Sequence, residues 1–363
     1  MVWPVIALAV LLGVAFFEIA FHLFFGHKAL AYFESCPPAQ VPSKPADPGA
    51  ERIEFPNGAG QTLRGAILKS SGQTTRGLVV FCPEMKANFW SFQAYLPAAR
   101  LAGFDILAFD FRNQGESDSE AGYSPLHWLT RKEISDLQAA VDFARARPEY
   151  KDLPIVLHGV SRGAGAALAV AAERSDISGV VTQGAFSCWS LLDYYMRKWK
   201  SSVVPRLQYV LPDWHNRITM AVTKRLSERR RGAHFTSIEP LLPRLAATPL
   251  LWMAAQRDSC VPTEVADSLF AKTGRPDSDF WAVPKARHNG ERVAQLTEFD
   301  RRLVRFLCMT AGIPVLPGDV KSVDDSTPAP LAVRYDSRHR TGSKAPTGRR
   351  FSLETSKDGR PEE

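Results

Sequence analysis

Residues 154–169 read PIVLHGVSRGAGAALA, and this stretch decides how the rest of the chain is interpreted. The apolar residues 155–157 predict a buried strand, and the small-residue stretch 164–169 predicts a helix. Between them, Gly-Val-Ser-Arg-Gly at 159–163 predicts a tight, strained turn, in which a Cβ at either glycine would collide with the neighbouring strand or helix. Such a turn exposes the hydroxyl group of Ser161 above the edge of a sheet, where it can act as a nucleophile.

A serine hydroxyl needs a base, and in folds with this turn the partners follow in the order serine, acid, histidine. Two histidines lie beyond the seventh expected strand, and one of them, His339, falls in a polar tail. The sequence therefore predicts His288, in Lys-Ala-Arg-His-Asn-Gly at 285–290, as the base. The alternative is an ordinary histidine of a surface loop.

The acid is expected at the end of the strand that precedes the base. The run LLWMAAQRD at 250–258 passes from apolar residues to a carboxylate, and a turn at Val261-Pro262 follows. We therefore predict that Asp258 orients His288. Asp267 and Asp193 are alternatives for the acid. The alternative role for Asp258 is that of an ordinary aspartate that initiates a turn.

Two backbone N–H groups are needed to stabilise a developing oxyanion. Arg162, which follows the nucleophile, is predicted to provide one, and the loop FCPEMK at 81–86 the other. Pro83 has no N–H, so the second donor is Glu84, or Met85 if the loop is shifted by one residue. The Glu84 carboxylate would repel an oxyanion unless it turns away or pairs with Lys86 or Arg162. The alternative is that this loop has only a structural role.

Four motifs together resemble the α/β-hydrolase superfamily over roughly residues 50–310. They are the Gly-x-Ser-x-Gly turn, DFRNQGES at 110–117, the strand TPLL at 248–251 followed by RDSCVP, and RHNG at 287–290. The chain looks most like N-terminally anchored, single-span serine hydrolases. The resemblance implies ester, thioester or amide hydrolysis without a metal or organic cofactor. It departs at Cys82-Pro83, where relatives commonly carry His-Gly, and we interpret DFRNQGES as mainly structural.

The spacing of apolar runs predicts an α/β fold with a mostly parallel eight-stranded sheet flanked by helices. Strands are expected at 53–55, 62–68, 77–81, 104–109, 155–157, 180–183, 250–254 and 280–283. Asn57-Gly58 predicts a hairpin and hence an antiparallel start. Helical stretches such as 91–102 and 134–147 separate the later strands, as parallel pairing requires.

The first residues, VWPVIALAVLLGVAFFEIAFHLFF at 2–25, are long and apolar enough to cross a membrane once. Glu18 and His22 are four residues apart, so they share a helical face and could hydrogen-bond to each other. Lys28 follows the span and no basic residue precedes it, which places the catalytic part in the cytoplasm. The alternative is an exported protein, cleaved as a signal peptide near Ala31, although no basic region precedes the apolar run.

The chain divides into a membrane anchor at 1–26, a proline-rich spacer at 27–50, a catalytic domain at 51–317 and a disordered tail at 318–363. The alternation of strands and helices lapses between about 187 and 247, which predicts a helical cap inserted over the sheet. Between residues 197 and 231 this cap carries ten Lys or Arg against two acidic residues, with aromatic residues interspersed. Such a surface suits anionic lipid headgroups; the alternative is a solvated face.

The formal charge of +7 is accompanied by no nucleic-acid-reading motif, so nucleic acid is excluded as a partner. The five cysteines are widely spaced and predict neither a disulfide framework nor a zinc site. We therefore expect a serine hydrolase acting on a small-molecule or lipid-like acyl substrate. The alternative function is a catalytically silent scaffold of the same fold at the membrane.

Overall fold

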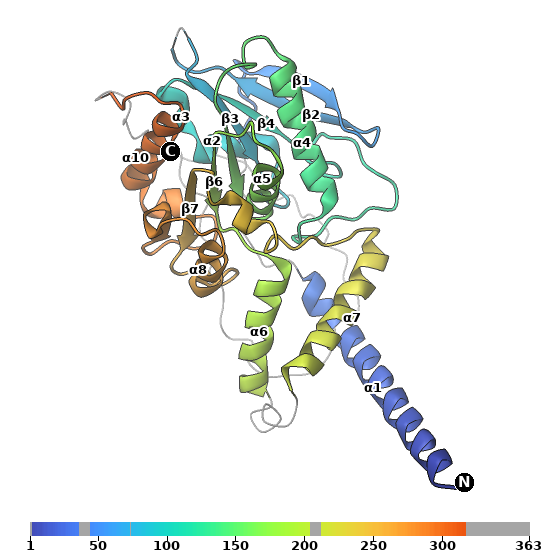
Figure 1. The fold of residues 1–363 in the computed structure, drawn as a ribbon. Helices are drawn as coiled ribbons and strands as arrows, with labels where there is room; N and C mark the ends of the chain where they lie inside the picture. Colours follow the sequence, from blue (N-terminus) through green and yellow to red (C-terminus); the bar gives the residue numbers. More distant parts are fainter. Residues whose placement is uncertain (1, 36–43, 73, 204–211, 317–363) are drawn as a thin grey trace, which may run out of the picture. The chain divides into compact units, whose positions relative to one another are not determined.

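The computed structural model describes residues 2–35, 44–72, 74–203 and 212–316, without the side chains of 199–203. The predicted tail at 318–363 and most of the proline-rich part of the spacer lie outside this range. The described residues form one eight-stranded sheet, of order β1-β2-β4-β3-β5-β6-β7-β8 (Figure 1). Its strands are β1 (Glu51–Pro56), β2 (Thr62–Leu68), β3 (Gly77–Cys82), β4 (Phe104–Phe109), β5 (Ile155–Val160), β6 (Gly179–Gln183), β7 (Leu250–Ala255) and β8 (Phe280–Val283).

The sheet is mostly parallel with an antiparallel start, as predicted. β1 and β2 form a hairpin in which Pro56 pairs with Thr62. Asn57 closes its loop, because its Oδ1 accepts hydrogen bonds from the N–H groups of Ala59 and Gln61. β2 is antiparallel to β4, and all later pairs are parallel.

Helices cover both faces of the sheet, because side chains of alternate strand residues point to opposite faces. One face packs against α4 (Arg131–Ala146), α5 (Arg162–Glu173) and α8 (Thr263–Ala271). The other packs against α2 (Phe92–Tyr95), α3 (Pro97–Leu101) and α10 (Leu296–Thr310). Short turns of helix, η1 (Phe89–Ser91), η4 (Asp277–Asp279) and α9 (Glu291–Ala294), connect these elements.

The helix predicted at 91–102 is interrupted. α2 ends at Tyr95 and α3 begins at Pro97, so the two are separated by Leu96. Proline is tolerated in the first turn of a helix but removes a hydrogen bond inside one, which explains the break. The helix predicted at 134–147 begins three residues earlier, at a capping box formed by Thr130 and Glu133.

In the described residues of the insertion between β6 and β7, 184–203 and 212–249, there are two long helices and a short one, in the region predicted as a cap. α6 (Cys188–Val203) follows β6 directly, and α7 (Asp213–Arg231) is followed by η3 (Leu242–Leu245). Thr130 forms an isolated bridge with Phe235, which ties the segment after α7 to the start of α4.

The N-terminal helix α1 (Val2–Glu34) is the one helix of the described residues that is long and apolar enough to cross a membrane. It continues through Glu34 and so includes eight residues, 27–34, that the sequence analysis placed in the spacer. Residues 2–17 are exposed along their whole length, whereas the polar face that begins at Glu18 packs on α7 (Figure 1). Ala29-Leu30-Ala31, the cleavage motif of the alternative prediction, lies inside this helix.

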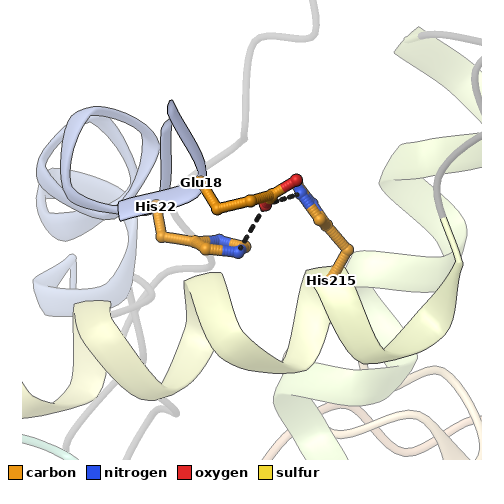
Figure 2. A group of neighbouring side chains, drawn as sticks. All are labelled: Glu18, His22 and His215. Carbon is orange, nitrogen blue, oxygen red and sulfur yellow. Dashed lines mark hydrogen bonds and ion pairs between the residues drawn. The ribbon is translucent and has the colours of Figure 1, made fainter. Parts of the chain in front are cut away.

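α1 and α7 run side by side in a constant register, with contacting residues 197 positions apart. His22 hydrogen-bonds to Thr219 at 2.8 Å. Glu18 hydrogen-bonds to His215 at 2.8 Å (Figure 2). Further along, the Thr223 hydroxyl group lies 3.3 Å from the Gly26 carbonyl oxygen, and Arg231 forms an ion pair with Glu34. The residue numbers of the contacting pairs rise together along both helices, so α1 and α7 are parallel. The polar residues of each helix recur every four positions and form a stripe, and the two stripes face each other.

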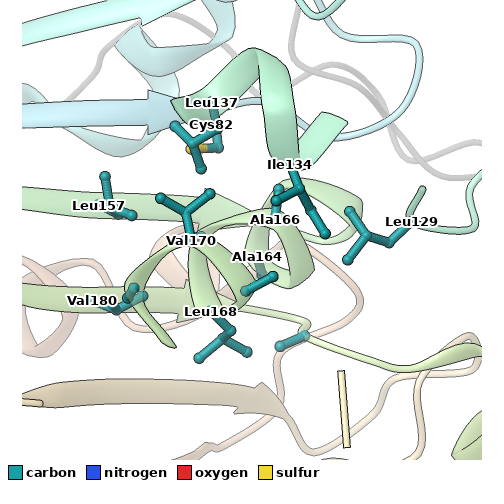
Figure 3. Packing of buried hydrophobic residues seen from close by; sticks show 14 of the residues in the cluster. Cys82, Leu129, Ile134, Leu137, Leu157, Ala164, Ala166, Leu168, Val170 and Val180 are labelled. Carbon is teal, nitrogen blue, oxygen red and sulfur yellow. The ribbon is translucent and has the colours of Figure 1, made fainter. Parts of the chain in front are cut away.

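The core that holds the turn around Ser161 lies between β5 and the helices of one face. Small residues of α5 such as Ala164 and Ala166 allow this helix to approach the sheet closely (Figure 3). Leu157 of β5, Val180 of β6 and Ile134 of α4 pack around it. Burying a side chain of this kind stabilises the folded state by about 1.5–3 kcal/mol. Because β5 and α5 both pack in this core, the turn between them is held at both ends.

Candidate active site

Ser161 stands at the turn between β5 and α5, where the sequence predicted it. Its backbone has φ 53° and ψ −115°, a conformation that non-glycine residues rarely adopt and that stores about 1–3 kcal/mol of strain. Its N–H donates to the carbonyl oxygen of Gln183 at the end of β6. The surrounding strands therefore hold the turn in this strained form.

The two glycines of the turn are required by close backbone contacts. A Cβ on Gly159 would lie 2.4 Å from the carbonyl oxygen of Gly163, and one on Gly163 would lie 2.1 Å from that of Cys82. Both distances are far shorter than any normal contact. The reason given for these glycines from the sequence therefore agrees with the geometry.

Ser161, His288 and Asp258 lie in one hydrogen-bonded chain. Ser161 Oγ is 3.0 Å from His288 Nε2, and His288 Nδ1 is 2.6 Å from Asp258 Oδ2. Ser161 has an exposed fraction of 9%, and the side chains of His288 and Asp258 have 9% and 1%. With the Nδ1 proton bonded to the carboxylate, Nε2 presents its lone pair to the serine hydroxyl group.

Asp258 is fixed by the turn that follows β7. Its Oδ1 accepts hydrogen bonds from the N–H groups of Cys260 and Val261, at 2.7 and 2.8 Å. Together with the bond to His288, this makes three hydrogen bonds to one carboxylate. The other two candidates lie elsewhere, since Asp193 forms an ion pair with Arg197 and Asp267 is exposed on α8.

The environment of His288 favours its protonated form. Burial alone would lower its pKa, but the hydrogen bond and charge of Asp258 outweigh it and raise the pKa above the ordinary 6.5. Glu291 and Glu84 add smaller electrostatic contributions in the same direction. The imidazole is thus suited to accept a proton and hold it during a reaction.

Gly184 lies close to Cε1 of the His288 imidazole ring. It has φ +58°, and a Cβ at this position would lie 2.9 Å from His288 Cε1. The sequence analysis did not single out this residue. Its place in the sequence could have indicated this role, because Gly184 follows β6 directly and so lies at the same edge of the sheet as Ser161.

Arg162 has two separate features. It is the first residue of α5, so its backbone N–H has no acceptor within the helix and is available to an oxyanion. Its guanidinium group is buried, donates to the Leu126 carbonyl oxygen at 2.9 Å and bonds to Gln114 Oε1. Gln114 in turn donates from Nε2 to the carbonyl oxygens of Glu84 and Ala87, both at 3.1 Å.

Gln114 belongs to DFRNQGES, the segment interpreted from the sequence as mainly structural. In the same segment, Asp110 accepts from the N–H groups of Phe89 and Glu116, at 2.7 and 2.8 Å. These bonds hold the segment against the loop after β3. Its contribution to the site is therefore the position of that loop.

Glu84 is buried at 1% exposure, and its carboxyl group accepts a 2.9 Å hydrogen bond from the Tyr95 hydroxyl group. It pairs with neither Lys86 nor Arg162, the two cations considered from the sequence. Burial raises its pKa from 4.5 to about 7. A substantial fraction is therefore neutral at neutral pH, which reduces the repulsion of an oxyanion without an ion pair.

A second buried carboxyl group, Glu291, was not anticipated from the sequence. It is fully buried at the start of α9, and burial raises its pKa from 4.5 to about 8. His127, also buried, interacts electrostatically with Arg162 and His288, and burial lowers its pKa to about 4. Tertiary packing brings both residues close to the site, and no local sequence motif predicts this.

We compared the chain with protein-family models, with curated protein sequences and with solved structures. A family model described as serine aminopeptidase, S33, matches residues 73–234, which include the turn around Ser161. The chain has the α/β-hydrolase fold. Its matched part is similar to a serine hydrolase family with esterase-like members.

Solved structures of other α/β hydrolases share the fold. An esterase from Pyrococcus furiosus is 19% identical with a TM-score of 0.55, over 75% of this chain and 97% of that one. The α/β hydrolase GrgF from a Penicillium species is 18% identical with a TM-score of 0.52, over 73% and 99%. At this identity the likeness concerns the fold alone. A comparison with curated protein sequences finds no match.

Proposed function

We propose that this α/β hydrolase cleaves an ester, thioester or amide of an acyl substrate, with Ser161 as nucleophile, His288 as base and Asp258 as the orienting acid. The observation that carries the proposal is the unbroken chain of hydrogen bonds at 3.0 and 2.6 Å through these three side chains. The strained backbone of Ser161 and the close contacts of its flanking glycines support it further.

In the proposed reaction, His288 Nε2 takes the proton of Ser161 Oγ as this oxygen attacks the carbonyl carbon. The carbonyl oxygen becomes negative and is stabilised by the N–H of Arg162 and by a second donor, Glu84 or Met85. The bond to the leaving group then breaks, and His288 returns the proton to the departing oxygen, sulfur or nitrogen. Water, deprotonated by His288, hydrolyses the acyl-serine to release the acid.

We further propose that α1 is a retained anchor and that the substrate is an acyl compound at a membrane surface. Residues 18–34 of α1 pack on α7 of the cap, and Phe33 joins the domain core, where its carbonyl oxygen accepts from Trp128 Nε1 at 3.0 Å. A cleaved signal peptide would have no reason to form such contacts. Lys28, which follows the span, supports the proposal that the catalytic domain lies in the cytoplasm.

The exposed face of α7 suits this position. Trp214 and Ile218 are exposed at its first turns, beside the apolar part of α1, and Arg225, Arg229 and Arg230 are exposed towards its end. An apolar end followed by a basic end matches the order of acyl chains and anionic headgroups at an interface. Arg217 lies among the apolar residues, and its long side chain can reach the headgroups.

Labelling of the full chain with a fluorophosphonate tests the hydrolase proposal, because only an activated serine forms the adduct. We expect labelling of the wild type and complete loss in Ser161→Ala and in His288→Ala. The control is Ser178→Ala, which changes a serine before β6, outside the site. Labelling that survives Ser161→Ala would refute the assignment of the nucleophile, and a wild type that never reacts would favour the silent scaffold.

A further inference from the structure

Three side chains of metal-ligating type meet where α1 packs on the first turn of α7. They are Glu18 and His22 of α1 and His215 of α7 (Figure 2), and their ligand atoms all lie within 4.8 Å of one another. Glu18 Oε2 is 2.8 Å from His215 Nε2 and 3.4 Å from His22 Nε2. Both histidines are buried at 5% exposure, and the cluster lies on elements that contribute no residue to the Ser161 site.

The hydrogen bonds of Thr219 are compatible with a His22 tautomer in which Nε2 is available to a ligand. The Thr219 hydroxyl group donates to the carbonyl oxygen of His215, at 3.2 Å, and lies 2.8 Å from His22 Nδ1. A hydroxyl group has one proton, so with that proton on the carbonyl it accepts the proton of Nδ1. His22 Nε2 then carries a lone pair directed towards Glu18 and His215, as in a metal-binding histidine held by a neighbouring oxygen.

Hydrogen bonding within the described residues leaves this nitrogen unsatisfied. His22 Nε2 is buried and has no hydrogen-bond partner, although the carboxylate of Glu18 is only 3.4 Å away. As an acceptor beside a carboxylate, it is repelled, and leaving a buried polar group unsatisfied is destabilising. A cation among the three atoms would remove both penalties, because it need not lie on the line between any two of them.

We propose that Glu18, His22 and His215 bind one divalent transition-metal ion of the Zn²⁺ class, which clips the membrane helix to the cap. Two imidazoles and one carboxylate are a donor set that Zn²⁺ accepts, with a fourth position left for water. Ligand atoms around tetrahedral Zn²⁺ are about 3.4 Å apart, so the His22–Glu18 distance already fits. The shorter His215–Glu18 distance widens when the ion replaces their hydrogen bond.

Two further features suit a metal site rather than a closed polar cluster. The side chain of Glu18 is 36% exposed, so the carboxylate is not enclosed by protein on all sides. Glu18 and His22 are spaced by four residues on one helix, so they can bind the same ion without any change of the backbone. His215 closes the site from the other helix, and metal binding therefore requires that α1 and α7 are docked.

The test uses the full chain in detergent or nanodiscs, purified without a histidine tag, and Zn²⁺ alone as the probe. We expect titration calorimetry and elemental analysis to give one tightly bound Zn²⁺ per chain, and a rise in melting temperature on addition of Zn²⁺. His22→Gln, His215→Gln and Glu18→Gln should each abolish the stoichiometric site. His27→Gln is the matched control, because His27 is exposed on the same helix and hydrogen-bonds to the Leu23 carbonyl oxygen of its own helix.

Thr219 provides a second measurement that does not remove a ligand. Thr219→Val should weaken Zn²⁺ binding about 10- to 100-fold, whereas Thr219→Ser should restore it. The melting temperature of each variant in chelator reports whether it is folded, and adduct formation at Ser161 is not needed for the reading. Absence of one-to-one binding in the folded wild type, or equal binding in the three ligand variants, would overturn the proposal.

Discussion

Gln114 accepts a hydrogen bond from the guanidinium group of Arg162, the residue that follows Ser161. Its amide nitrogen donates to the carbonyl oxygens of Glu84 and Ala87, at 3.1 Å each. One side chain thus connects the start of α5 with the loop after β3, the two segments proposed to provide the oxyanion donors. Because an oxyanion hole depends on donor positions within tenths of an ångström, Gln114 is proposed to act as a positioning residue.

Gln114→Ala should therefore lower kcat about tenfold or more and leave KM nearly unchanged, because the oxyanion forms only in the transition state. The measurement is steady-state kinetics on a water-soluble ester. Gln138→Ala is the matched control, since Gln138 bonds to Glu173 on the surface. An equal loss in both variants, or a rise of KM alone, would contradict the role given to Gln114.

Gly184→Ala should slow adduct formation at Ser161, because the added Cβ would lie 2.9 Å from His288 Cε1 and displace the imidazole. Gly274→Ala is a matched control for backbone strain, since Gly274 also has a positive φ, of +68°, but open space around it. Both variants should lose about 1 kcal/mol of stability in a denaturant titration. If both label at the wild-type rate, the contact with His288 does not matter for the reaction.

Asp258→Asn should lower kcat by about 10⁴-fold while the fold is retained, because an amide can no longer hold the imidazole in the tautomer that presents Nε2 as acceptor. The melting temperature should change far less than the rate. Asp267→Asn, on the exposed face of α8, should behave as wild type. Near-normal turnover in Asp258→Asn would mean that another carboxylate serves His288.

The pH dependence should reflect two buried groups with opposite demands. His288 must be neutral to act as base, and its raised pKa makes activity rise with pH through that value. Glu84 has a pKa of about 7, and its ionisation above this pH places a negative charge beside the oxyanion. We expect Glu84→Gln to retain activity on the alkaline side, where the wild type declines. Identical pH–rate profiles would refute this effect.

Stability should respond to Glu84 in the opposite direction from most carboxylates. Folding raises its pKa from 4.5 to about 7, so the contribution of the group to the free energy of unfolding is fully present below pH 4.5 and is lost as the pH rises through about 7. The full effect is on the order of 3 kcal/mol. Denaturant titrations between pH 4.5 and 8 should therefore show a shallower decline for Glu84→Gln than for the wild type.

The strands and the catalytic turn could be predicted because their signals are local. Apolar runs such as 104–109 and 280–283 gave strand bounds that agree with β4 and β8, and the glycines around Ser161 announced the strained turn. The pairing of Arg162 with Gln114 could not be predicted, since buried polar contacts depend on packing between distant segments. Glu18 and His22 were recognised as one polar face, but nothing local indicated that α7 would cover it.

The register between α1 and α7 has a practical consequence for soluble versions of this enzyme. Cutting the chain after residue 35 would remove Phe33 from the domain core. It would also remove Glu34, the carboxylate that pairs with Arg231. It would also expose His215, Thr219, Thr223 and Ser227 as a bare stripe on the cap. The membrane segment is in this sense part of the folded domain, and a shortened form that begins near residue 18 preserves more of the native protein than one that begins at the first strand.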